Sequence, residues 1–235
     1  MGYPLNHKSV QEIYRETAQQ YDLKLHSLNL GALLSEGTMN YAEGTTKGEW
    51  ARKSLVKGFE ACRTLDIPIV VITADPTEAT FDHVVSHLDF ACRLAKDSGI
   101  EIAIESGGTL EMTERLLGGL DSDVKTCMDI LNPFRFGTGN AQEQIAGFGK
   151  EKISHLHVKD SKRELFQRGQ RGCVLLGEGD GGFAESVEAL KAIDYEGWIM
   201  TENYYYLPPM NDGDEDFMDL AIRDLMTMRK AFRQD

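Results

Sequence analysis

The chain has few positive charges, no long apolar run and no paired cysteine motif. Its 235 residues carry 25 lysines and arginines against 38 aspartates and glutamates, a formal net charge of -13. A nucleic acid or an anionic membrane surface would be repelled at long range, so neither is expected as a partner. No apolar run approaches the roughly 18 residues that span a bilayer, and the first residues lack the basic region of a secretory signal.

The cysteines stand far apart in the sequence and show no C-x-x-C spacing, at Cys62, Cys92, Cys127 and Cys173. This spacing argues against a zinc knuckle or a disulfide framework, and it favours a reducing, cytoplasmic location. With 41% hydrophobic residues, the chain is expected to fold as one domain over residues 1–235.

Short β-branched apolar runs alternate with longer segments of helical period, which is typical of parallel β/α units. Six strands are expected, at 23–28, 67–74, 100–106, 124–130, 153–160 and 197–203. Helices are expected near 9–21, 51–62, 81–95, 110–117, 141–148, 183–193 and 215–232.

Ionisable residues stand near the C-terminal ends of four of these strands, at Glu105, Asp129, His157 and Glu202. An open sheet would spread these ends over tens of ångströms, whereas a barrel brings them together around one axis. The expected fold class is therefore α/β, a (β/α) barrel of the TIM type.

Three carboxylates that point into one mouth beside an imidazole repel one another strongly if all are ionised, unless a cation lies between them. A divalent metal ion resolves that conflict. The ligands are mostly hard oxygen atoms with one nitrogen, so manganese is favoured, and magnesium, cobalt and zinc remain open.

The stretches IAIES, CMDILNP, ISHLHVKDSKR, LGEGDGGF and YEGWIMTEN resemble successive landmarks of the xylose-isomerase-like sugar isomerase and epimerase superfamily. The resemblance covers nearly the whole chain. It implies that Glu105, Asp129, His157 and Glu202 bind one divalent metal ion. Within the ketose 3-epimerase branch, the resemblance also implies substrate-binding roles for Glu111 and Arg163. The chain departs from that branch at Asn132, where the branch has a substrate-binding histidine. Asn132 can still donate a hydrogen bond, so it is also expected to bind the substrate.

The implied reaction is a sugar or polyol isomerisation or epimerisation. The metal would stabilise an enediolate, while Glu105 and Glu202 remove and return a proton. A dehydratase of the same superfamily, or a barrel without catalytic activity, remains an alternative. The abasic-site endonuclease branch is disfavoured, because its metal centre needs more histidines and a basic groove.

Several other features have plainer interpretations. His155 shares the inward face with His157 but lies one layer deeper, where a hydrogen-bonded core role is expected. The histidines on helices, His87 among them, are expected to be solvated. The segment GEGDGG at 177–182 is expected to be a tight turn rather than a phosphate site, because its two carboxylates would oppose a phosphate.

The first expected strand takes the place of the third strand of the superfamily, so the first two of the eight barrel strands are expected to be missing. Open strand edges are normally covered. A homo-oligomer, the N-terminal segment, or a true start codon upstream of the recorded one would account for the gap.

Overall fold

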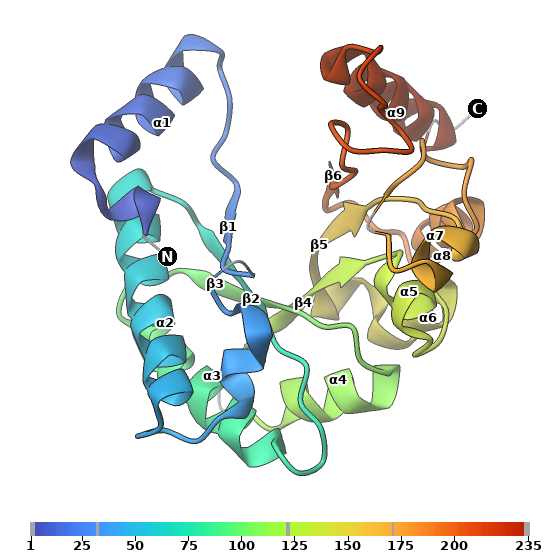
Figure 1. The fold of residues 1–235 in the computed structure, drawn as a ribbon. Coiled ribbons are helices and arrows are strands. Elements are labelled where there is room, and N and C mark those ends of the chain that lie inside the picture. Colours follow the sequence, from blue (N-terminus) through green and yellow to red (C-terminus); the bar gives the residue numbers. More distant parts are fainter. Residues whose placement is uncertain (1–2, 32, 121–122, 171, 233–235) are drawn as a thin grey trace. The chain divides into compact units, whose positions relative to one another are not determined.

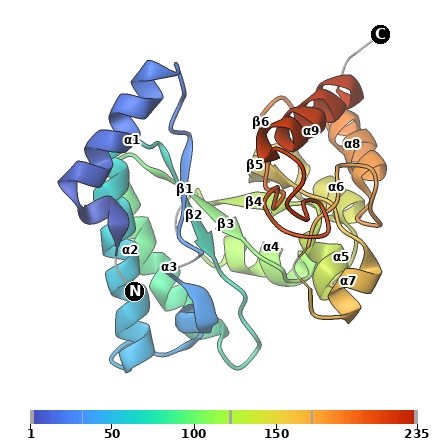
Figure 2. The same cartoon turned by 45° about the horizontal axis from the view of Figure 1, so that its top comes forward.

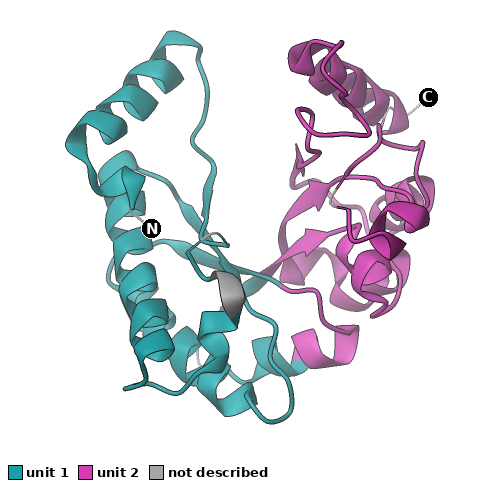
Figure 3. Ribbon diagram, in the orientation of Figure 1, with its two compact units in different colours: residues 1–105, 115–125 teal, residues 106–114, 126–235 magenta. Residues whose placement is uncertain are grey.

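The computed structural model describes residues 3–31, 33–120, 123–170 and 172–232. Two compact units divide the chain (Figure 3). The first contains residues 1–105 and 115–125, and the second contains residues 106–114 and 126–235. The single domain expected over residues 1–235 stays a prediction.

Three parallel strands form the sheet of the first unit: β1 (Ser27–Asn29), β2 (Ile69–Thr73) and β3 (Glu101–Glu105). Val70 and Val71 of β2 and Ala103 of β3 are fully buried. The helices α2 (Thr46–Leu65) and α3 (Phe81–Lys96) pack against these strands and against each other (Figure 1).

One face of α2 is an apolar stripe of four residues that are all 0% exposed: Ala51, Leu55, Phe59 and Cys62. Thr45 caps the helix, because its hydroxyl accepts a hydrogen bond from the N–H of Gly48 at 3.1 Å. This unit also contains α1 (Lys8–Gln20) and the short 3-10 helices η1 (Pro4–Asn6) and η2 (Ser35–Asn40). Helix α4 (Leu110–Gly118) has residues in both units.

The second unit has three parallel strands of its own: β4 (Lys125–Asp129), β5 (Ile153–Val158) and β6 (Trp198–Thr201). Its helices are α5 (Asn132–Phe136), α6 (Ala141–Lys152), α7 (Arg163–Gln167), α8 (Phe183–Ala192) and α9 (Phe217–Ala231). Helix α6 packs against β5 and α8, and α9 packs against β6 (Figure 2).

All six predicted strands and all seven predicted helices are confirmed in the described residues. The described residues therefore contain six parallel strands, where a complete barrel of this type has eight. The first strand begins at Ser27 rather than at residue 23. Helices α5 and α7 were not predicted, because five residues are too few to show a helical period. No helix in the described part of the chain has both the length and the apolar composition that crossing a bilayer requires.

The segment 177–182 wraps around the buried carboxylate of Asp160. One oxygen, Oδ2, accepts hydrogen bonds from the N–H groups of Gly177 and Gly179, each at 3.0 Å. The other, Oδ1, accepts from Gly181 at 3.1 Å and from Ser161 at 2.8 Å. A Cβ at position 179 would overlap Asp160, so glycine is required there. These N–H groups already bind Asp160, which agrees with a structural turn and argues against a phosphate site.

Asp160→Ala should lower the free energy of unfolding by about 3 kcal/mol, because four N–H donors lose their acceptor in a buried loop. Urea unfolding followed by circular dichroism would measure this change. Asp212→Ala, at an exposed position, serves as the control. A loss no larger than that of the control would contradict the structural role of Asp160.

His87 is buried in α3, with an exposed fraction of 0%. Its Nε2 donates a hydrogen bond to the carbonyl oxygen of Tyr41 at 2.8 Å. Nδ1 has no hydrogen-bond partner within the described residues. Burial lowers the pKa of His87 below its ordinary value, because the charged ring would lose its hydration. The prediction that His87 is solvated was wrong, because α3 is covered on this face by η2 and α2.

His87 should make the protein less stable in mild acid. Below pH 6.5 the unfolded state binds a proton that the folded state resists, so the free energy of unfolding should fall until the folded pKa is reached. The loss is up to about 1.4 kcal/mol for each pH unit in that window. Urea unfolding at pH 7.5 and pH 5.5 should show a smaller pH effect in His87→Gln than in the native protein. An equal pH effect in both proteins would contradict the role of His87.

Candidate metal centre

Three predicted ligands meet at the C-terminal ends of the strands of the second unit. Asp129 is the last residue of β4, His157 lies near the end of β5, and Glu202 directly follows β6. Each offers a ligand atom, and these three atoms lie within 4.8 Å of one another. The Cα of Asp129 pairs with that of His157 across the parallel ladder, so strand register alone makes these two residues neighbours.

The two carboxylate oxygens of Asp129 have different partners. Its Oδ1 accepts hydrogen bonds from the backbone N–H groups of Leu131 at 2.8 Å and Asn132 at 3.1 Å, where α5 begins. Its Oδ2 contacts the ammonium group of Lys159. The backbone therefore holds one oxygen in place and directs the other toward the cluster.

Lys159 is a buried cation of this cluster that was not among the predicted site residues. Its side chain is 5% exposed, and Nζ lies 2.6 Å from Oε2 of Glu202 in addition to its contact with Asp129. The signal was present in the sequence, because residues two apart on a strand share a face and Lys159 follows His157 by two.

Opposite charges perturb the pKa values of this cluster. Burial alone would raise the pKa of Glu202, but His157 and Lys159 overcome that effect and lower it to about 2. Burial alone would lower the pKa of Lys159, but the carboxylates of Asp129 and Glu202 raise it above the usual range. His157 lowers the pKa of Glu202 through its Nδ1, which lies 3.5 Å from Oε2 of Glu202. Glu202 is therefore a carboxylate, and Lys159 an ammonium ion, at neutral pH.

A buried hydrogen-bond network positions the segment that carries Glu202. Asn203 accepts a hydrogen bond from the N–H of Asp160 at 3.1 Å and donates to Asp224 at 2.6 Å. Asp224 is 0% exposed and also accepts from the Tyr205 hydroxyl at 3.0 Å. Burial raises the pKa of Tyr205, so this hydroxyl stays protonated as a donor. Tyr205 thus packs against the buried core of the second unit.

Glu105, the fourth predicted ligand, is the last residue of β3 and of the first stretch of the first unit. Its side chain is largely buried, and its Oε2 accepts a hydrogen bond from Nδ2 of Asn29 at 3.1 Å. The next residue, Ser106, opens the 106–114 segment of the second unit.

The three predicted substrate-binding residues lie in the second unit. Asn132 is buried at the start of α5, whereas Glu111 is exposed in the first turn of α4. Arg163 is exposed at the start of α7, and its guanidinium lies over the ring of Phe134, 4.5 Å from the centroid. Their substrate-binding roles stay predictions, as do those of the metal ligands and of the catalytic pair Glu105 and Glu202.

Parallel strands linked by helices, with ionisable residues at successive strand ends, define the class of (β/α)-barrel proteins. A family model described as xylose isomerase-like TIM barrel matches residues 3–220. The chain belongs to this family.

Solved structures of similar fold cover most of this chain. The IolI protein with a bound zinc atom matches at a TM-score of 0.76 and 19% identity, over 97% of this chain and 83% of that one. A D-tagatose 3-epimerase-like protein matches at 0.71 and 19%, over 96% and 83%. D-allulose 3-epimerase from Methylomonas sp. matches at 0.73 and 18%, over 94% and 82%. No protein among the curated sequences matches this chain.

Lys159→Met should destabilise the metal-free protein by about 3 kcal/mol, because the buried carboxylates of Asp129 and Glu202 lose their compensating cation. Added Mn²⁺ should restore the stability, since a divalent ion supplies the missing charge. Thermal unfolding with and without Mn²⁺ measures both effects.

The matched control for this experiment is Lys191→Met, which removes a lysine from an exposed pair with Glu188. Its stability should change little and should not depend on Mn²⁺. A Lys159→Met protein that unfolds like the native protein would rule out charge compensation by Lys159.

Proposed function

We propose that this protein is a divalent-metal-dependent isomerase or epimerase of a sugar or polyol. The observation that carries the proposal is the cluster at the ends of β4, β5 and β6. There Asp129, His157 and Glu202 offer ligand atoms within 4.8 Å of one another around a buried ammonium group.

The donor set fits a divalent ion. The carboxylates of Asp129 and Glu202 both contact one ammonium group, that of Lys159, which supports a site that attracts positive charge. Oxygen donors with a single imidazole favour Mn²⁺, with Mg²⁺, Co²⁺ and Zn²⁺ as alternatives. Glu105 completes the proposed set, since it ends β3 and is joined directly to the 106–114 segment of the second unit. A bound divalent ion would supply Lewis-acid polarisation of a substrate carbonyl.

Glu202 suits the role of a proton-transfer group. It is ionised at neutral pH, and its side chain is one-third exposed, so a substrate can reach it. We assign proton transfer at the carbon next to the substrate carbonyl to Glu105 and Glu202, one of which removes the proton while the other returns it. Return to the opposite face of the same carbon gives epimerisation, and return to the neighbouring carbon gives isomerisation.

The remaining residues suit recognition of a polyhydroxylated substrate. Arg163 is exposed and has its guanidinium plane supported by Phe134, so it can donate to a substrate oxygen. Asn132 and Glu111 are assigned to substrate hydroxyl groups. The neighbours described as ketose 3-epimerases and as a zinc-bound protein support a small sugar and a divalent ion.

We further propose a cytoplasmic homo-oligomer that binds no nucleic acid. The strong negative charge supports the last point. Exposed apolar side chains on α9 support subunit contact: Phe217, Met218, Ile222, Leu225 and Met226.

Proton exchange at carbon tests the reaction directly. The Mn²⁺-loaded protein is incubated with a panel of ketoses in deuterated water, and deuterium next to the carbonyl is followed by proton NMR. Exchange is expected for at least one sugar, because reversible proton removal exchanges with solvent even where net conversion is slow. Glu202→Gln should lower the exchange rate by at least about 100-fold, since an amide cannot accept the proton.

Glu196→Gln is the control, because Glu196 is an exposed glutamate on the segment leading into β6. The Glu196→Gln protein should catalyse exchange at the native rate. Removal of the metal should stop exchange in this variant and in the native protein. A product lighter by one water would identify a dehydratase instead. Full exchange in Glu202→Gln would remove Glu202 from the catalytic role.

A further inference from the structure

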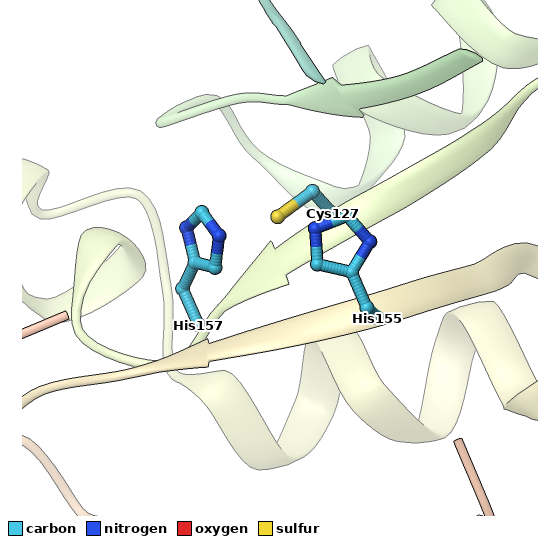
Figure 4. A group of neighbouring side chains, drawn as sticks. All are labelled: Cys127, His155 and His157. Atoms are coloured by element: carbon cyan, nitrogen blue, oxygen red, sulfur yellow. The ribbon is translucent and has the colours of Figure 1, made fainter. Parts of the chain in front are cut away.

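A second group of metal-binding side chains lies on the same face of β4 and β5, one layer before the first. Cys127 and His155 stand opposite each other in the parallel ladder, and His157 follows His155 by two residues. The ligand atoms of Cys127, His155 and His157 lie within 4.8 Å of one another. In Figure 4 the sulfur of Cys127 lies between the two imidazole rings.

These three side chains are held in the interior of the second unit. Cys127 is 1% exposed, His155 is 0% and His157 is 7%. The two imidazole rings have their centroids 5.4 Å apart at an interplanar angle of 63°, so their edges rather than their faces approach. Nδ1 of His155 lies 3.0 Å from the hydroxyl of Ser154, a contact that orients the ring as outer partners orient metal-binding histidines.

We propose that Cys127, His155 and His157 form a second metal site, selective for thiophilic ions such as Zn²⁺ and Cd²⁺. One thiolate and two imidazoles are softer ligands than the carboxylates of the first site, so manganese and magnesium are disfavoured here. Tetrahedral zinc places neighbouring ligand atoms about 3.5 Å apart, and small side-chain rotations reach that value from separations below 4.8 Å. The fourth position is left to water.

Binding at this site has a defined proton balance. The S–H bond of Cys127 breaks, its proton passes to the buffer, and a bond forms between the thiolate and the ion. No oxidation or reduction occurs.

The two sites share His157 and therefore exclude each other. A neutral imidazole binds a metal through one nitrogen, because the other carries the proton. When an ion is bound by Cys127, His155 and His157, His157 is therefore not free to act as a ligand together with Asp129 and Glu202. The mutual exclusion of the two sites rests on the metal centre of the proposed function. The second site itself does not depend on that function.

Cadmium titration of the metal-free protein tests the second site without reference to activity. One equivalent of Cd²⁺ should produce the ultraviolet absorption of a cadmium thiolate, and Mn²⁺ should not. Cys127→Ser should abolish this absorption and weaken Cd²⁺ binding by at least about tenfold, since even outer-shell partners contribute that much. His155→Gln should weaken binding as well. Isothermal titration calorimetry measures the affinities.

Cys92→Ser is the matched control, because Cys92 is a buried cysteine of α3 outside the cluster. It should keep the absorption. Glu202→Gln should also keep it, so that a failure of the proposed enzyme activity stays separate from a failure of this site. In the native protein, binding of Cd²⁺ should release the Cys127 proton to a weakly buffered solution, a measurement that needs no variant. Cadmium binding without thiolate absorption, absorption that survives in Cys127→Ser, or absorption lost in Glu202→Gln would each overturn the proposal.

Discussion

The proposed site depends on the repulsion between two carboxylates that lie close together at the ends of β4 and β6. Asp129 is almost fully buried, and Glu202 carries a second negative charge within reach of the same cation. A buried carboxylate such as that of Asp129 stays ionised beside a second carboxylate only with a compensating positive charge. In this structure Lys159 supplies that charge, and the same geometry offers three ligand atoms to a divalent ion.

In the second unit, backbone groups as well as side-chain packing hold the two carboxylates close together. N–H groups at the start of α5 fix one oxygen of Asp129, and the Asn203–Asp224 pair anchors the segment after β6. Three N–H groups of the 177–182 loop and that of Ser161 bind the carboxylate of Asp160, three residues beyond His157. Rigid strand ends of this kind suit a catalytic site, because a displacement of about 1 Å of a reacting group can lower the rate strongly.

The donor chemistry of β4 and β5 changes over a single layer of side chains. Asp129 and His157 at the strand ends belong to an oxygen-rich set, whereas Cys127 and His155 one layer earlier form a soft set with the same imidazole. One histidine therefore belongs to two groups with different metal preferences. The hypothesis of a core role for His155 and that of a ligand role both follow from its inward position on the strand.

The sequence alone determined six strands, the seven longer helices and the inward positions of the strand-end residues, because alternation along strands and the helical period are local properties. The five-residue helices α5 and α7 are too short to show that period. It also carried the landmarks of the xylose isomerase-like family, to which the chain belongs. Only the tertiary structure showed that Lys159 turns into the carboxylate cluster, that His87 is buried beneath η2 and that Asp160 occupies the glycine-rich loop. Each of these depends on a partner distant in sequence, and no local pattern specifies which distant group a polar side chain will meet.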